Sequence, residues 1–120
     1  MPKLIEIKSF KDERGSLSVL EENIPFDIKR VFYIYDVDNS VRGNHRHHKT
    51  IQAAICIKGS CIIKNDNGNN KTEYLLDSPN KCLLLYPKDY HSMSSFTKDA
   101  ILLVLASEKF DPEDYIYEPY

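Results

Sequence analysis

The densest group of reactive side chains is the segment Arg42-Gly43-Asn44-His45-Arg46-His47-His48-Lys49, which holds three of the four histidines of the chain. In a β-strand, His45 and His47 point to the same face, whereas His48 points to the opposite face or begins a turn. Two imidazoles on one face can bind a metal ion, or act as general acid and base near neutral pH. A solvated strand edge is the alternative, but a same-face pair beside arginine and glycine favours a functional site.

The residues after this pair follow a spacing that resembles a known motif. Four residues separate His47 from Gln52, and six separate Gln52 from Gly59. The pattern resembles the first motif of the cupin superfamily, in which two histidines, a glutamate and a glycine recur at those intervals. Pro87-Lys88-Asp89-Tyr90-His91 resembles the second motif, so we expect the fourth histidine, His91, to face the same site.

The carboxylate of the cupin metal site is missing, because Gln52 stands where the glutamate would be. Three neutral histidines can hold zinc or iron weakly. An amide is a poor metal ligand, however, and Arg42 and Arg46 would repel a cation. We therefore expect no functional metal ion and no other cofactor.

The elements that must position these residues are short strands. Segments of five to eight residues rich in Val, Ile, Tyr and Phe are broken by turn residues, and none shows a sustained helical stripe, which predicts an all-β protein. The expected strands are 16–20, 29–37, 43–47, 51–58, 61–65, 71–77, 81–86, 91–96 and 100–107. The segment Asn65 to Asn70 predicts a hairpin turn, and a short helix is expected around Asp111 to Tyr115, after Pro112.

Many short strands in a chain of this length favour a barrel or sandwich, because closure removes unpaired strand edges. We expect a single domain over residues 1–120, since two separate cores would each be too small. The strand Ala100 to Ala106 is apolar on both faces, which favours cover by a second subunit; a sandwich within one chain is the alternative. A homodimer is the expectation.

Composition narrows the classes of function. The chain has 16 basic and 18 acidic residues, which are interleaved, so no basic stripe could hold a nucleic acid. The amino terminus lacks the pattern of a secretion signal and the longest apolar run is too short to span a bilayer, so we expect a cytoplasmic protein. Cys56, Cys61 and Cys82 lie in apolar segments without metal-site spacing, and are expected to be buried free thiols.

Together these segments resemble the metal-independent sugar 3,4-ketoisomerases of the cupin superfamily, a family called WxcM-like. The likeness covers nearly the whole chain and follows the order of its motifs. The segments that carry it are 12–17, 25–34, 41–47, 87–93, 105–108 and 114–116. The resemblance implies a cupin fold, also called a double-stranded β-helix or jelly-roll-like barrel.

The resemblance also implies a reaction. A dTDP-sugar 3,4-ketoisomerase of deoxyaminosugar biosynthesis moves the carbonyl of dTDP-4-keto-6-deoxyglucose from C4 to C3 through an enediol, which needs a base and an acid but no redox cofactor. His47 matches the second histidine of the family's pair and is the expected base, and His45 is expected to assist it. Tyr33 matches a tyrosine that the family places near the sugar. Because Tyr33 and Tyr35 alternate with Val31 on one strand face, at least one is expected to reach the site as a proton donor.

Further residues are expected to bind the substrate. A nucleotide diphosphate needs directional cationic donors, for which guanidinium groups are suited; Arg42 is the first candidate, and Arg30 and Arg46 could equally form ordinary ion pairs. Gly43 either lets the backbone approach the ligand or forms a bulge. The expected substrate-binding set is Arg42, Arg30, Arg46, Tyr35, Gln52, His91 and Gly43.

Two other functions remain open from the residues alone. A 3,5-epimerase-like cupin would use the same proton abstraction without moving the carbonyl, and the Arg-Gly-x-His-x-His run favours the ketoisomerase over it. A nucleotide-sugar-binding cupin without catalysis would tolerate loss of either histidine. The configuration of the product at C4 does not follow from the spacing.

Overall fold

The computed structural model describes residues 2–120. Within this range it has twelve strands and one 3-10 helix: β1 (Lys3–Glu6), β2 (Lys8–Asp12), β3 (Gly15–Val19), β4 (Arg30–Tyr35), β5 (Arg42–His47), β6 (Gln52–Lys58), β7 (Cys61–Asp66), β8 (Lys71–Leu76), β9 (Lys81–Leu85), β10 (Tyr90–Ser94), β11 (Ile101–Ala106), η1 (Pro112–Asp114) and β12 (Tyr115–Ile116). Every predicted strand is present, with ends that agree to within two residues. The all-β prediction is confirmed.

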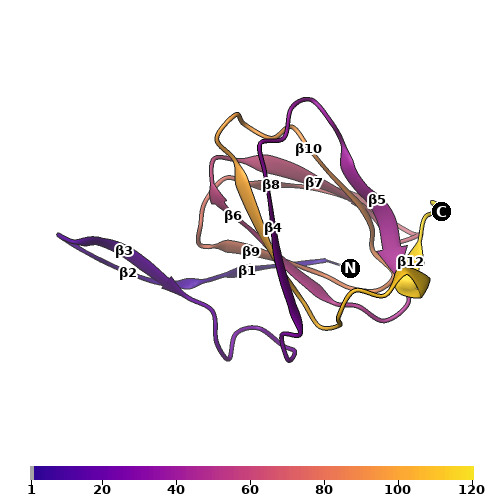
Figure 1. Ribbon diagram of the computed structural model, residues 1–120, viewed down its shortest axis with the longest axis horizontal. Coiled ribbons are helices and arrows are strands. Elements are labelled where there is room, and N and C mark those ends of the chain that lie inside the picture. Colours follow the sequence, from indigo (N-terminus) through magenta and orange to yellow (C-terminus); the bar gives the residue numbers. More distant parts are fainter. Residues whose placement is uncertain (1) are drawn as a thin grey trace.

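Two five-stranded sheets face each other and enclose the core (Figure 1). The first sheet has the order β1-β9-β6-β11-β4, and the second has the order β12-β5-β10-β7-β8. Alternation along each strand sends one set of side chains inward, so Ala54, Leu102 and Val104 of the first sheet belong to the same buried cluster as Ile63 and Leu76 of the second. This is the expected cupin-like barrel.

The outer face of the first sheet is only partly covered. The segment between β3 and β4 lays Ile24 and Phe26 against outward-facing residues such as Ile55 and Leu105, which form a second buried cluster. At the β4 edge this cover is missing, and the alternating residues Val31, Tyr33 and Tyr35 are 56%, 62% and 57% exposed. The part of the outer face that β4 forms is therefore apolar and exposed to solvent.

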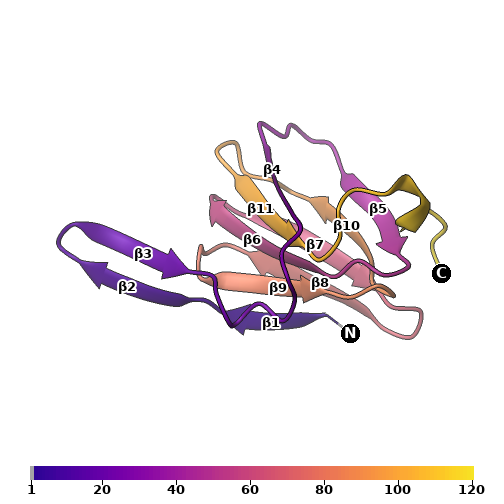
Figure 2. The ribbon, with the colours of Figure 1, turned by 60° about the horizontal axis from the view of Figure 1, so that its bottom comes forward.

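The hairpin of β2 and β3 projects from the barrel, as Figures 1 and 2 both show. Its residues are exposed except for the last one, and Phe10 pairs across the hairpin with Leu17, both apolar and exposed. The sequence reading did not predict β1 or β2, because Lys8–Asp12 has only one apolar residue and Lys3–Glu6 only two.

The turn and helix predictions are confirmed. Residues 67–70 connect β7 to β8, with Gly68 at φ +95° as a tight reversal requires. Asp111 caps η1 by accepting a hydrogen bond from the backbone N–H of Glu113, and Pro112 begins it. In the described range, no helix has the length and apolar character needed to cross a bilayer. The three cysteines are buried and free, as expected.

Candidate functional site

Three histidines meet where β5 and β10 run side by side. His45 pairs directly with His91 across these antiparallel strands, and His47 lies two residues further along β5. The centroid of the His45 ring is 4.9 Å from that of His47 and 5.0 Å from that of His91, while those of His47 and His91 are 6.3 Å apart. We call His45, His47 and His91 the histidine cluster. The prediction that His91 joins the pair is met by this geometry.

A bulge in β5 brings the strands into this register. Gly43 has φ +87° and Asn44 has φ +59°, and the pairing with β10 shifts between His91 and Ser92. A Cβ atom on Gly43 would lie 3.0 Å from the carbonyl oxygen of His91, so a larger residue would push the strands apart. Gly43 was expected either to form a bulge or to let the backbone approach a ligand, and the structure shows the bulge.

His47 is held by Asp114, a residue that the sequence reading did not include among the site residues. Nδ1 of His47 lies 3.0 Å from Oδ2 of Asp114, and both side chains are buried. The same carboxylate accepts hydrogen bonds from Thr50 Oγ1 and, at 2.8 Å, from the backbone N–H of Lys49. Burial raises the pKa of Asp114, but the hydrogen bonds from Thr50, Lys49 and His47 outweigh it and hold that pKa below its usual range.

His91 is held by the backbone. Its Nδ1 lies 3.0 Å from the carbonyl oxygen of Asp89, and the residue is 1% exposed. The Asp89 side chain is itself fixed, since it accepts hydrogen bonds from Nδ2 of Asn65 at 3.1 Å and from the backbone N–H of Tyr86 at 2.8 Å. The position of the His91 ring is therefore fixed by the turn that precedes β10.

All three histidines are uncharged at neutral pH. Burial lowers the pKa of His45 to about 4 and that of His91 to about 3, with the neighbouring histidines adding to the effect. Burial also lowers the pKa of His47, although Asp114 opposes this through its hydrogen bond and charge, and Arg30 lowers it further. A neutral imidazole is the form that can accept a proton.

The hydrogen bonds fix which nitrogen of His47 and of His91 is the acceptor. A carboxylate and a carbonyl oxygen can only accept, so Nδ1 of each ring carries the hydrogen and Nε2 carries the lone pair. Both Nε2 atoms are buried, and neither has a partner within residues 2–120. The site thus holds two acceptor nitrogens that no protein donor satisfies.

Tyr115 is the second residue that the sequence reading missed. Its ring centroid lies 4.8 Å from that of His45 and 4.6 Å from that of His47. Its hydroxyl oxygen accepts a hydrogen bond of 3.2 Å from Nη1 of Arg30, which leaves the hydroxyl hydrogen free to be donated elsewhere. The arginine also stacks over Phe32, at 4.5 Å from its ring centroid.

Arg42 and Gln52 lie on the inward face. Directly opposed residues of an antiparallel pair share a face, and Arg42 pairs with Met93, a member of the core between the sheets. Arg42 is exposed, so it lies at the rim of that face. Gln52 is 4% exposed and shares its face of β6 with the core residue Ala54.

Three predicted site residues lie elsewhere. Tyr33 and Tyr35 stack on each other on the outer face of the first sheet, with ring centroids 5.8 Å apart, because Phe32 and Ile34 take the inward positions of β4. The expectation that one of them reaches the histidines is wrong within one chain. Arg46 alternates with His45 and His47 and stacks on Tyr120 instead, 4.0 Å from its ring centroid. Within one chain it lies on the opposite face of β5 from the histidines, contrary to its predicted place beside them.

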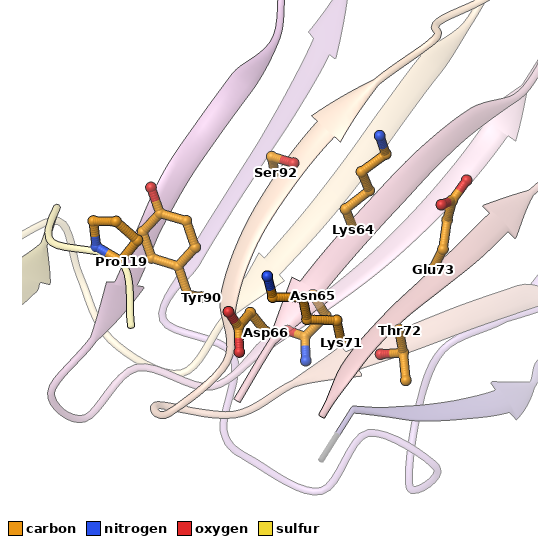
Figure 3. A pocket seen from close by; sticks show the side chains of 9 residues that line it. All are labelled: Lys64, Asn65, Asp66, Lys71, Thr72, Glu73, Tyr90, Ser92 and Pro119. Carbon is orange, nitrogen blue, oxygen red and sulfur yellow. The ribbon is translucent and has the colours of Figure 1, made fainter. Parts of the chain in front are cut away.

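A separate groove lies on the other side of β10. The groove has a volume of about 350 Å³, and the residues that line it include Tyr90 and Ser92 of β10, Lys64 of β7 and Glu73 of β8 (Figure 3). Because side chains alternate along β10, His91 points to the opposite face. The groove is therefore distinct from the histidine cluster.

Among residues 2–120, no group of three or more His, Cys, Asp and Glu side chains is arranged to hold a metal ion. The carboxylate that contacts the histidine cluster, that of Asp114, is bound to Nδ1 of His47 and not to the unpartnered Nε2.

Comparison with known proteins identifies the family of this chain. The family model described as "FdtA: WxcM-like, C-terminal" matches residues 1–120. A TDP-4-oxo-6-deoxy-alpha-D-glucose-3,4-oxoisomerase of Aneurinibacillus thermoaerophilus is 45% identical over 117 residues, which is 95% of this chain and 84% of that protein.

Two solved structures are similar over 98% of this chain. A 3,4-ketoisomerase from Helicobacter canadensis has a TM-score of 0.94 and 38% identity, with 90% of that chain covered. A mutant of the 3,4-ketoisomerase QdtA from Thermoanaerobacterium thermosaccharolyticum, in complex with TDP-4-keto-6-deoxyglucose, has a TM-score of 0.94 and 39% identity, with 87% covered. With the full-length match and these likenesses, the chain that carries this histidine cluster belongs to the FdtA family of WxcM-like proteins.

Proposed function

We propose that this protein is a sugar 3,4-ketoisomerase, an isomerase that converts TDP-4-keto-6-deoxyglucose into the corresponding 3-keto sugar. The observation that carries the proposal is His47, a neutral histidine oriented by a buried carboxylate and presenting an unpartnered Nε2. The names of the relatives supply the substrate and the reaction. The site supplies what such a reaction requires, which is a fixed base beside a hydroxyl donor.

The reaction moves two protons and no net electrons. The base breaks the C3–H bond, the released pair forms C3=C4, and the carbonyl pair moves onto the C4 oxygen, which is protonated. The C3 hydroxyl then loses its proton, a carbonyl forms at C3, and the C3=C4 pair takes a proton at C4. In sum, one proton passes from C3 to C4 and another from the C3 oxygen to the C4 oxygen, so acid and base groups suffice.

His47 is the proposed base and carrier of the carbon-bound proton. Its Nε2 accepts the proton from C3 and returns it to C4, and Asp114 stabilises the imidazolium formed between these steps. His45 stands beside it as the proposed hydrogen-bond partner of the substrate. Tyr115, which replaces Tyr33 in this role, donates its hydroxyl hydrogen to the C4 oxygen, while Arg30 supports the charge that develops on the phenol.

Arg42 is the proposed ligand of the diphosphate, because it is exposed at the rim of the inward face and guanidinium binds phosphate oxygens through two parallel hydrogen bonds. Arg30 is engaged with Tyr115 and acts at the sugar rather than at the phosphates. Gln52 and His91 are proposed to contact the sugar from the inward face. Gly43 acts indirectly, by allowing the bulge that aligns the histidines.

A homodimer is the proposed assembly. The open half of the first sheet's outer face presents Val31, Tyr33 and Tyr35 to solvent, and Leu103 of β11 is half-buried beside them. The projecting hairpin adds a second apolar pair, and an isolated two-stranded hairpin is marginally stable without a surface to pack against. Sedimentation of the wild type and of Tyr33→Lys tests the proposed dimer. The wild type should sediment as a dimer and Tyr33→Lys as a monomer.

We propose the cytoplasm as the place of action, since three buried free thiols suit a reducing compartment. Two alternatives to the ketoisomerase are retained as outcomes of the assay: an epimerase-like cupin would exchange the C3 proton without moving the carbonyl, and a binding protein would do neither. No observation on this chain favours either of them over the ketoisomerase.

The proposed function is tested with His47→Asn. The variant should lose isomerisation and keep its affinity for TDP, because the base is removed while the diphosphate contacts remain. His48→Asn is the matched control, since His48 is the next residue but its side chain is exposed and it joins the site only through a backbone hydrogen bond to Asp114. A wild-type rate in His47→Asn would disprove the base assignment.

A further inference from the structure

His91 has a feature that base catalysis by His47 does not explain. The residue is 1% exposed, yet its Nε2 has no hydrogen-bond partner within residues 2–120. Leaving a buried acceptor without a hydrogen-bond donor destabilises the folded protein. A buried acceptor of this kind calls for an explanation, and a bound ligand that supplies the donor is one.

The chemistry of the missing partner follows from the tautomer. The carbonyl oxygen of Asp89 forces the hydrogen of His91 onto Nδ1, so Nε2 can only accept. The pKa of His91, lowered by burial to about 3, keeps the ring neutral throughout the physiological range. Nε2 therefore needs a hydrogen-bond donor, and it is a poor base for a carbon-bound proton.

The position of His91 relative to His47 indicates which chemical group carries the missing donor. The two rings are nearly parallel, with an interplanar angle of 25° and centroids 6.3 Å apart, and each presents an unpartnered Nε2. Two lone pairs cannot satisfy each other, so a ligand that reaches both nitrogens must offer them two hydrogens. A carbon that carries both a hydrogen and a hydroxyl group meets this requirement.

We propose that Nε2 of His91 accepts the hydrogen bond of the sugar hydroxyl on the carbon from which His47 removes the proton. This inference rests on the proposed function and assigns a specific hydroxyl to a specific nitrogen. It makes His91 a determinant of specificity: the site accepts α-hydroxy ketones and rejects sugars that lack this hydroxyl, because Nε2 would stay unpaired in their complexes. His45 is half-buried and its ring centroid lies 5.0 Å from that of His91, so the ligand is expected to enter on the His45 side of the cluster.

Two substitutions separate this role from packing. The amide of asparagine can take the place of Nδ1 and keep the hydrogen bond to Asp89, but it cannot reach the position of Nε2. The longer glutamine can place its amide oxygen there as an acceptor. We expect His91→Asn to lower kcat/KM roughly tenfold, in line with one lost hydrogen bond, and His91→Gln to recover most of it. Ser92→Ala, on the opposite face of β10, is the matched control (Figure 3).

A measurement that needs no turnover makes the test independent of the proposed function. In ¹⁵N NMR spectra of histidine-labelled His47→Asn protein, the Nε2 resonance of His91 is assigned by its loss in the double variant with His91→Asn. The nucleotide sugar should shift this resonance toward that of a hydrogen-bonded nitrogen, and TDP alone should not. An unchanged resonance with the sugar, or equal losses of kcat/KM in the asparagine and glutamine variants, would overturn the inference. Absence of isomerisation by the wild type would instead overturn the proposed function.

Discussion

Nδ1 of His47 lies 3.0 Å from Oδ2 of Asp114, although 67 positions separate the two residues in the sequence. The contact forms because β12 pairs with β5, opposing Tyr115 to His47 at the end of the second sheet, and Asp114 immediately precedes β12. The carboxylate fixes the tautomer of His47 and supplies a counter-charge when the ring is protonated. The base of the proposed reaction is thus a pair of residues.

Asp114→Asn is expected to lower kcat at least roughly hundredfold. The carboxylate receives three donors, so an amide NH₂ in its place must face one of them or force the hydrogen of His47 onto Nε2. Asp111→Asn is the matched control, because it removes the same charge three residues away and asparagine is also a good helix cap. Steady-state kinetics check this; equal rates in both variants would show that the carboxylate does not orient the base.

Tyr115→Phe is expected to lower kcat roughly tenfold to a thousandfold while the affinity for TDP is unchanged. The substitution keeps the ring against His45 and His47 and removes only the hydroxyl group that Arg30 contacts. Tyr117→Phe is the control, since Tyr117 stacks on Tyr115 but is 66% exposed. If kcat of Tyr115→Phe equals that of the wild type, another group donates the proton to the C4 oxygen.

The rate should stay high in mild acid. The base must be neutral, and burial lowers the pKa of His47 below the ordinary histidine value of 6.5, so protonation begins to inhibit only below that pH. The profile of kcat/KM against pH is therefore expected to have its acidic limb below pH 6.5. A limb centred at or above 6.5 would contradict the assignment of a buried histidine as the base.

Acid should also weaken the fold. The three histidines of the cluster have a lower pKa in the folded than in the unfolded chain, so below pH 6.5 the unfolded chain binds more protons and stability falls as the pH falls. For His91, with a folded pKa of about 3, the loss is roughly 3 kcal/mol at pH 4. Urea unfolding followed by circular dichroism should show a lower midpoint at pH 4.5 than at pH 7, and the difference between the two midpoints should be smaller in His91→Gln.

The proposed single domain over residues 1–120 also predicts that urea unfolding occurs in one cooperative transition.

Removal of metal ions should leave the activity unchanged, because each proposed step moves protons between side chains and substrate. Protein treated with a strong chelator and passed over a desalting column should retain the wild-type kcat. Loss of activity that added zinc or iron restores would contradict the proposed mechanism and would return the histidine cluster to the class of metal sites.

The local patterns predicted much of this architecture. Turn residues and strand periodicity located nine strands. The spacing of His45, His47 and His91 predicted that their side chains lie in one cluster, as they do in the structure. The error with Tyr33 has a simple cause. A period of two determines which residues share a face, but both faces of β4 are apolar, so the pattern does not determine which face turns inward.

Asp114 and Tyr115 could not be assigned to the site from local patterns, because only long-range pairing of β12 with β5 brings them to His47. A signal for their local structure did exist in the cap and proline that begin η1 at Asp111 and Pro112. That signal predicts where the chain turns but does not identify the strand it joins. The carboxylate partner of His47 therefore had to come from the fold.

The central claim is tested most directly by NMR of the purified protein with TDP-4-keto-6-deoxyglucose in deuterated water, following C3 and C4 of the sugar. Ketoisomerisation predicts a 3-keto product, and the configuration at C4 can be assigned from the same spectra. The share of deuterium at C4 reports how often the proton held by His47 exchanges with solvent before it returns to the sugar. Deuterium exchange at C3 with the carbonyl still at C4, or an unchanged sugar, would contradict the claim.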